Sequence, residues 1–278
     1  MKFTEKLLNI SSKNNSLVCV GLDADLNKVP KLLLKEKDVI FEFNKKIIDA
    51  TSDLVCAYKP NMAFYELYGN KGWESLQKTC QYIPDEIPII IDAKRGDIGN
   101  TARMYAKAFF EELKADAITL SPYMGQDAIS PFLEYKDKCA LVLCLTSNIG
   151  AEDFQLLEMR DEPLYIKVAK KVVSWNKNKN CGLVVGATQA EQLRGIREIA
   201  PDMPILIPGI GAQGGDLEMA VKFGTDKNGN LAIVNSSRSI LYASSGEDFA
   251  QKAKEETEKL REEINLHREK MMSDSEPV

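Results

Sequence analysis

Eight short apolar runs recur along the chain, each followed by a stretch with helical periodicity. Their hydrophobicity is continuous rather than alternating, which is typical of strands covered on both faces in a parallel sheet. The runs span residues 17–23, 54–60, 87–94, 115–122, 139–146, 181–188, 203–211 and 231–238. The amphipathic segments between them include residues 39–53, 100–114, 163–177 and 191–200. Eight strand–helix units in about 240 residues predict an α/β fold, the (β/α)8 or TIM barrel.

An open doubly wound sheet is the alternative architecture. No G-x-G-x-x-G motif follows the first run, and eight units favour closure into a barrel. No segment rich in Gly, Ser or Pro divides the chain, so we predict one domain over residues 1–278. Residues 147–163 predict a loop insertion after strand five. A Lys- and Glu-rich stretch near the end predicts a C-terminal helix, followed by a frayed tail over residues 271–278.

Composition narrows the range of partners. The chain has 278 residues, 44% of them hydrophobic, which suffices for a sizeable core. Its formal net charge of −5 gives no electrostatic reason to bind nucleic acid or an anionic membrane. Its first residues lack the features of a secretory signal, and no run approaches the roughly 18 apolar residues of a membrane span. We therefore predict a cytoplasmic protein whose partners are small molecules.

The cysteines and the single histidine exclude several kinds of site. The six cysteines form no C-x-x-C pair, and several lie in apolar runs, so we predict reduced, buried thiols. The only histidine, His267, lies in the charged C-terminal stretch, where we expect a solvated side chain. A Ser-His-Asp triad, a Cys-His pair and a multi-histidine zinc site all require imidazole at the site, so none of them is predicted.

Polar side chains gather where the predicted strands end. In a barrel these ends meet at one mouth, where the chemistry of such folds takes place. The residues at these ends are Asp23, Asp25, Lys59, Asp92, Lys94, Asp97, Ser147, Asn148, Gln213 and Arg238.

Four of these residues suggest a specific chemistry. Asp92 and Lys94 are two apart on one strand and so face the same side, and Lys59 ends the neighbouring strand. Carboxylates that flank a lysine keep it protonated, which suits it to stabilise and then protonate a carbanion. The alternative is an ion pair at Asp92 and a helix N-cap at Asp97, although Asn100 is a second candidate for the cap.

A second cluster suggests a phosphate site. The glycine-rich segment 207–216 follows strand seven, and residues 234–240, which include Arg238, follow strand eight. Barrels of this kind commonly hold a phosphate at these two loops, through backbone N–H groups and a helix N-terminus. A plain tight turn is the alternative for the glycines.

The motifs resemble those of the orotidine 5′-phosphate decarboxylase family. The segment DAKRGDIGNT has the family's D-x-K-x-x-D-I-x-x-T signature, and VGLD, KPN, PGIGAQGG and a Ser-Arg pair follow strands one, two, seven and eight in the required order. The resemblance runs over roughly residues 15–245 and is closest to the longer bacterial subgroup. It implies conversion of orotidine 5′-monophosphate to UMP and CO2 in pyrimidine biosynthesis, without cofactor or metal, by a homodimer that shares its active sites.

The same resemblance implies roles for individual residues. Lys94 is implied as the proton donor to C6 of the pyrimidine, with Asp92 next to the substrate carboxylate and Lys59 in contact with the ribose. The residues that match those contributed by the partner chain are Asp97, Ile98 and Thr101.

Other residues match the substrate-binding positions of the family. Asp23 matches the ligand of the ribose hydroxyl, and Ser147 matches the serine that reads the pyrimidine amide, with Thr146 and Asn148 as alternatives. The residues at the phosphate end are Pro208, Gly209, Gln213, Ser237 and Arg238. Ser237 stands where many family members have glycine.

Two other functions remain open from the residues. A related phosphosugar barrel, such as a keto-gulonate phosphate decarboxylase or a hexulose phosphate synthase, would use Mg²⁺ with acidic ligands, for which Asp23 and Asp25 are candidates. A non-catalytic barrel that binds a nucleotide would explain the phosphate loops but not the two lysines and two carboxylates at the mouth.

Overall fold

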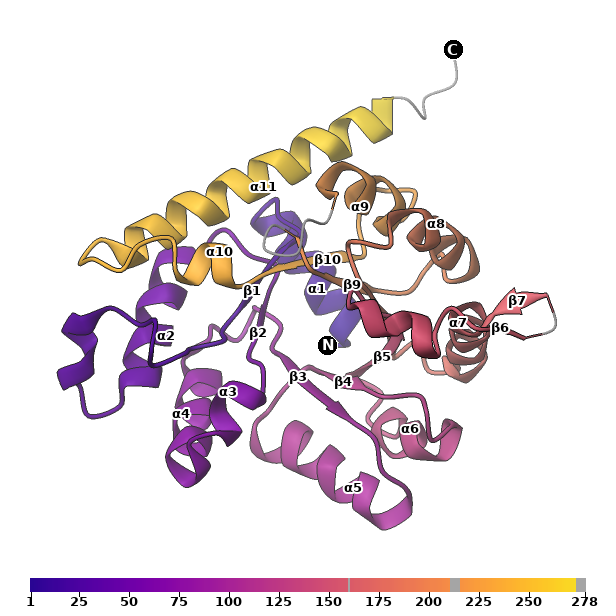
Figure 1. Cartoon of the computed structure of the whole chain (residues 1–278), viewed down its shortest axis with the longest axis horizontal. Helices are drawn as coiled ribbons and strands as arrows, with labels where there is room; N and C mark the ends of the chain where they lie inside the picture. The colour runs from indigo at the N-terminus through magenta and orange to yellow at the C-terminus, as the bar shows by residue number, and fades with distance from the viewer. Residues whose placement is uncertain (160, 211–215, 274–278) are drawn as a thin grey trace.

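The computed structural model describes residues 1–159, 161–210 and 216–273. Eight of the described strands form one parallel sheet in the order β2-β1-β10-β9-β8-β5-β4-β3 (Figure 1). In chain order these strands are β1 (Val18–Gly21), β2 (Ala57–Lys59), β3 (Ile90–Arg95), β4 (Ala117–Leu120), β5 (Cys139–Leu145), β8 (Cys181–Val185), β9 (Ile205–Pro208) and β10 (Ala232–Ser236). Seven of them lie within the predicted runs, and β3 extends one residue past its predicted run of 87–94, to Arg95.

The first and last strands of that order, β2 and β3, also meet. Parallel bridges join Tyr58 to Ile89 and Asn61 to Asp92, and the Asp92 amide donates to the carbonyl of Pro60 at 2.9 Å. The sheet therefore closes, and the predicted (β/α)8 barrel is confirmed against the open doubly wound sheet. This closed arrangement explains why the strand sequences are continuously hydrophobic. One side of each strand fills the barrel, and the other side packs beneath the helices.

Helices surround the sheet and connect its strands (Figure 1). They are α1 (Phe3–Lys13), α2 (Val39–Thr51), α3 (Ala63–Glu66), α4 (Gly69–Tyr82), α5 (Gly99–Lys107), α6 (Gln126–Leu133), α7 (Leu164–Trp175), α8 (Ala190–Ile199), α9 (Leu217–Gly224), α10 (Arg238–Leu241) and α11 (Phe249–Ser273). A π-helical turn, Ala108–Glu112, continues α5, and a 3-10 turn, Lys31–Lys35, precedes α2. The four amphipathic segments named from the sequence form α2, α5, α7 and α8.

Helix α1 closes the N-terminal end of the barrel. The amide of Phe3 donates to Asp137 O at 2.8 Å, and Lys6 Nζ lies 2.8 Å from Asp116 Oδ2. Asn14 Nδ2 donates to Val55 O at 2.8 Å. These partners lie just before β5, β4 and β2, so the opposite end, where the strands finish, is left for a site.

The described residues of the insertion after β5 include regular elements. It contains a 3-10 turn, Ile149–Asp153, and a small antiparallel hairpin of β6 (Glu158–Met159) and β7 (Glu162–Pro163). The hairpin projects from the barrel beside α7 (Figure 1).

Helix α11 packs across α2, α9 and α10 (Figure 1). It reaches Ser273, so the first three residues of the predicted tail are helical, which corrects that part of the prediction, and residues 274–278 lie outside the described chain. His267 is half-buried rather than solvated, and its Nδ1 is buried without a hydrogen-bond partner among the described residues. The neighbouring Arg268 connects α11 to the segment before β10, since its Nε donates to Gly229 O at 2.8 Å.

All six cysteines are buried and free, as predicted. Burial raises the pKa of the Cys19 thiol to about 12, which makes the thiol unreactive at neutral pH. Within the described ranges, no helix combines the length and the apolar character required to cross a bilayer.

Candidate active site

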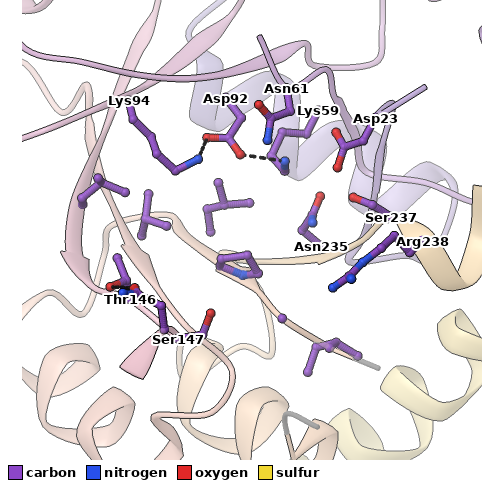
Figure 2. Close-up of a pocket in the computed structure, with 17 residues that line it drawn as sticks. Asp23, Lys59, Asn61, Asp92, Lys94, Thr146, Ser147, Asn235, Ser237 and Arg238 are labelled. Atoms are coloured by element: carbon purple, nitrogen blue, oxygen red, sulfur yellow. Dashed lines mark hydrogen bonds and ion pairs between the residues drawn. The ribbon is translucent and has the colours of Figure 1, made fainter. Parts of the chain in front are cut away.

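A cavity of about 350 Å³ opens at the C-terminal mouth of the barrel. Its volume is in the range typical of small-molecule sites. The described residues that line it are Asp23, Lys59, Asn61, Asp92, Lys94, Leu143, Thr146, Ser147, Asn148, Val184, Leu206, Pro208, Gly209, Ile210, Asn235, Ser237 and Arg238. Figure 2 shows polar groups on three sides of the cavity, with the lysines and Asp92 on one side, Ser237 and Arg238 on a second, and Thr146 and Ser147 on a third.

One carboxylate joins the two lysines at the mouth. Asp92 Oδ2 lies 3.0 Å from Lys59 Nζ, and Asp92 Oδ1 lies 2.6 Å from Lys94 Nζ (Figure 2). The Lys59 side chain is 4% exposed, whereas the Lys94 side chain is 50% exposed. Lys59 is therefore a buried counter-ion of the carboxylate. The Lys94 ammonium is left accessible to a ligand in the cavity.

Burial and charge act in opposite directions on this group. Desolvation alone would lower the pKa of Lys59, but the charges of Asp92 and Asp23 raise it above its ordinary value. Desolvation alone would raise the pKa of Asp92, but Lys59 and Lys94 hold it well below its usual range. Lys59 and Asp92 are therefore both ionised at neutral pH.

A threonine that the sequence did not indicate completes this group. The Thr119 hydroxyl on β4 donates to Asp92 Oδ1 at 2.9 Å and accepts from the amides of Ala93 and Lys94, each at 3.0 Å. Threonine is common in strands, so position 119 carries no signal in the sequence.

Two buried oxygen atoms on the cavity wall lack partners. Asp23 Oδ1 and Asn235 Oδ1 have no hydrogen-bond partner within the part of the chain that the structure describes. Because an unsatisfied buried polar atom is costly, such atoms on a cavity wall indicate a polar ligand. Asn235 was not predicted, although it lies in the segment VNSSR that follows the last run.

The two acids of the first loop separate. The Tyr242 hydroxyl donates to Asp23 O and accepts from the Asp25 amide, both at 2.8 Å, which fixes the loop between them. The carboxylate of Asp25 accepts from Asn27 Nδ2 and lies near Lys28 Nζ, away from the cavity lining. Of the two candidate Mg²⁺ ligands, only Asp23 reaches the mouth. Among the described residues, no group of three or more His, Cys, Asp or Glu is arranged to hold a metal ion.

The predicted phosphate end is assembled in part. Pro208, Gly209, Ser237 and Arg238 line one side of the cavity, and Gly209 has φ +103°, a conformation that favours glycine. Gln213 lies outside the described residues. Gly21, in the VGLD motif, lies against Ser237, and any side chain at position 21 would collide with the Ser237 hydroxyl.

The opposite side of the cavity carries the three candidates for reading a base. Thr146, Ser147 and Asn148 all line the cavity. The Thr146 hydroxyl donates to Asn148 Oδ1 at 2.6 Å and accepts from Gln155 Nε2 at 2.9 Å, so Thr146 is already engaged. Gln155 belongs to the insertion, and the sequence did not indicate it.

Gly186 also shapes this side. A Cβ at Gly186 would lie 2.7 Å from both the amide nitrogen and the Cβ of Ser147. Only glycine at position 186, directly after β8, lets the backbone of Ser147 approach so closely.

Asp97, Ile98 and Thr101 are outside the lining of this cavity. Asp97 Oδ1 accepts from the Ile98 amide at 2.8 Å, and Ile98 is 51% exposed. Ile98 is the N-cap residue of α5, and no side chain caps the helix, so the alternative that placed Asp97 or Asn100 at the cap is wrong. The fourth member of the predicted Lys-Asp-Lys-Asp array therefore does not join the other three within one chain.

Fold and site together define a (β/α)8-barrel enzyme with a lysine–aspartate group in its C-terminal mouth. The sequence matches the family described as "Orotidine 5'-phosphate decarboxylase / HUMPS family" over residues 16–253. The chain belongs to this family.

Individual relatives agree with this assignment. The chain is 52% identical over 274 residues to an orotidine 5'-phosphate decarboxylase of Dehalococcoides mccartyi, covering 97% of this chain and 100% of the relative. It is 53% identical over 265 residues to one of Flavobacterium johnsoniae, with coverage of 94% and 96%. Among solved structures, the OMP decarboxylase of Leishmania donovani superposes with a TM-score of 0.84 at 40% identity, covering 96% of this chain and 99% of that one.

Proposed function

We propose that this chain decarboxylates orotidine 5′-monophosphate to UMP and CO2, as the names of its relatives indicate for those proteins. The observation that carries the proposal is the Lys94 ammonium, half-exposed in the cavity and 2.6 Å from the buried Asp92 carboxylate. A protonated lysine fixed at the mouth suits a reaction in which negative charge appears on carbon.

The proposed mechanism is electrostatic. When the bond between C6 and the carboxylate breaks, its electron pair stays on C6 in the plane of the ring, where no adjacent carbonyl can delocalise it. The Lys94 ammonium stabilises this charge because it is already oriented by Asp92 before the reaction. Lys94 then gives a proton to C6, CO2 leaves, and solvent reprotonates the amine. No step of this mechanism requires a metal or a cofactor.

Asp92 has two effects in this scheme. It orients the Lys94 side chain through their 2.6 Å contact, and its own charge lies next to the substrate carboxylate, which raises the energy of the bound substrate. We place the first effect ahead of the second because electrostatic preorganisation is usually the larger contribution to catalysis. Lys59 keeps Asp92 ionised and contacts the ribose.

The rest of the cavity suits the other parts of the nucleotide. We assign the ribose hydroxyls to Asp23, whose Oδ1 lacks a partner among the described residues, and the pyrimidine amide to Ser147. We assign the phosphate to Arg238, Ser237, Pro208 and Gly209, together with Gln213, which lies outside the described residues. Phosphate binding far from C6 can order the site before the reaction.

We further propose that the active enzyme is a homodimer in which each site takes the partner subunit's Asp97, Ile98 and Thr101. Exposed apolar side chains on the third and fourth units support an interface here. Ile98 is 51% exposed, Met104 49%, Tyr123 86% and Met124 46%. Figure 1 shows the two units side by side, with α5 next to α6. The partner subunit's Asp97 would add the second carboxylate to Lys94.

These proposals place the chain at the UMP-forming step of pyrimidine biosynthesis, as a cytoplasmic enzyme formed by a single domain. Nucleic acid and membranes have no part in this function.

The experiment is a direct assay of the purified protein with orotidine 5′-monophosphate, following CO2 release and UMP formation, with and without EDTA. We expect stoichiometric CO2 and UMP at the same rate in both samples. Binding of UMP without CO2 release would refute the enzyme in favour of a nucleotide-binding barrel. Loss of activity in EDTA would favour the Mg²⁺-dependent phosphosugar enzymes of the family.

A further inference from the structure

The hydroxyl of Thr119 is saturated by three partners, all in one segment of β3. It accepts from the amides of Ala93 and Lys94 and donates to Asp92 Oδ1, at 2.9 to 3.0 Å. A threonine hydroxyl has one donor and two acceptor sites, so none is left for another group. Thr119 is 1% exposed, which removes water as a competing partner.

The segment that Thr119 holds is irregular. In the pairing of β3 with β4, Ile91 faces Ile118 and Arg95 faces Leu120, so four steps along β3 correspond to two along β4. β3 therefore bulges opposite Thr119, and Lys94 within the bulge has φ +48°. Such a conformation is strained in a residue that has a Cβ, and it persists only where surrounding bonds stabilise it.

The bulge controls where the lysine ammonium lies. In a regular strand, the side chains of residues 92 and 94 would run parallel on the same face. Here the turned backbone of Lys94 brings its Nζ to within 2.6 Å of Asp92 Oδ1, the same oxygen that accepts from Thr119. One hydroxyl thus contacts the backbone that carries the lysine and the carboxylate that orients it.

We propose that Thr119 is a positioning residue, which sets the Lys94 ammonium by fixing the bulge and the Asp92 carboxylate together. The inference rests on the proposed function for its kinetic consequence. Its structural consequence, the place of Lys94 Nζ, does not depend on the identity of the substrate.

The test compares Thr119→Val, which keeps the branched shape and removes all three bonds, with Thr119→Ser, which keeps the hydroxyl. Ile118→Val is the matched control, because it removes one buried methyl group from the adjacent residue, which has no role in the site. We expect Thr119→Val to lower kcat about 100-fold, the effect of displacing a reacting group by about 1 Å. UMP affinity and KM should stay near those of the parent, Thr119→Ser should recover most of the turnover, and Ile118→Val should keep it.

Several outcomes would overturn the proposal. Parental kcat in Thr119→Val would do so, as would equal losses of kcat and UMP affinity with no recovery in Thr119→Ser, which is the pattern of a merely structural residue. Should Thr119→Val fail to fold, Thr119→Cys replaces it, since a thiol is only a weak hydrogen-bond donor and acceptor, and the same loss of kcat is expected.

Two further measurements separate this proposal from the proposed function. Turnover of orotidine 5′-monophosphate by the parent tests the function alone, whereas the ratio of variant to parent tests Thr119. A crystal structure of Thr119→Val should show Lys94 Nζ moved away from Asp92. An unchanged contact would refute the positioning role whatever the parent's activity.

Discussion

Lys94 Nζ lies 2.6 Å from Asp92 Oδ1 although both residues belong to the same strand and Lys94 has a left-handed backbone. The contact leaves half of the lysine side chain exposed to the cavity, while Lys59 covers the other oxygen of the carboxylate. A cation in this place is restrained by its contact with Asp92 and still accessible to a ligand. These properties are what the proposed proton donor needs.

Replacing Lys94 with alanine should abolish turnover while leaving the cavity open. We expect decarboxylation to fall by at least about 10⁴-fold, since both the electrostatic stabilisation and the proton donor are removed. UMP should still bind, because its phosphate and ribose contacts come from other residues. Stopped assays of CO2 release and calorimetric titration with UMP measure the two effects. Lys171→Ala, at an exposed lysine on α7, is the control and should behave as the parent, and turnover retained in Lys94→Ala would contradict the assignment.

Lys59→Met should reduce stability in a pH-dependent manner. In the parent, Lys59 and Lys94 lower the pKa of Asp92, so the stabilisation from its ionised form is complete above the ordinary value of 3.8 and is lost only as pH falls through the lower folded-state pKa. Removing Lys59 leaves a buried carboxylate with one half-exposed cation. We expect a loss of about 3 kcal/mol in the free energy of unfolding at neutral pH, the low end for breaking a buried pair.

Lys59→Met should also change how the free energy of unfolding depends on pH. Without Lys59, the folded-state pKa of Asp92 should be higher than in the parent, because burial opposes its charge and only Lys94 remains to lower it. Protonation then relieves the partly compensated charge, so the deficit in stability relative to the parent should shrink as pH falls. Urea unfolding between about pH 5 and pH 8 measures this trend. Lys94→Met is the comparison, because its half-exposed pair should contribute only about 1 kcal/mol or less. Equal losses in the two variants would be inconsistent with the buried role of Lys59.

Gly186→Ala should displace Ser147. The new Cβ would lie 2.7 Å from the Ser147 amide nitrogen, so the backbone must shift, at a cost of about 1 to 3 kcal/mol. If Ser147 reads the pyrimidine, KM for orotidine 5′-monophosphate should rise. Gly195→Ala is the matched control, since nothing lies within 4 Å of a Cβ at that position in α8, and it should be neutral or stabilising by up to about 1 kcal/mol. Thermal unfolding and steady-state kinetics of both variants test the pair, and an unchanged KM in Gly186→Ala would argue for Asn148 instead.

Mixing two inactive variants tests the shared site. Dimers of Lys94→Ala and of Asp97→Ala each lack one member of every site, but a hybrid dimer has one site with both changes and one with neither. Random exchange of subunits should restore about one quarter of the parental sites. Activity after co-refolding, with native mass spectrometry to show hybrids, is the measurement. Proven hybrids without recovered activity would count against the contribution of the partner subunit's Asp97.

Local pattern was sufficient for the architecture and for the charged residues at the mouth. Continuous apolar runs arise wherever a strand is buried on both faces, so the eight strands, the closed barrel and the buried cysteines could be predicted from periodicity and composition. Lys59, Asp92 and Lys94 could be placed together because parallel strands end at the same rim.

The remaining features of the site depend on contacts between segments that are apart in the sequence. Thr119 lies 27 residues from Asp92 and Gln155 lies nine from Thr146, and neither has a local signal that distinguishes it from an ordinary strand or loop residue. The bulge at Lys94 and the close approach of Gly186 to Ser147 follow from the pairing of strands. The absence of a side-chain cap from Asp97 on α5 likewise depends on the conformation of the loop after β3. Alternation and helical periods report only which face of an element is buried, whereas the direction of a hydroxyl or a backbone turn depends on the neighbour across the sheet, which appears only when the barrel closes.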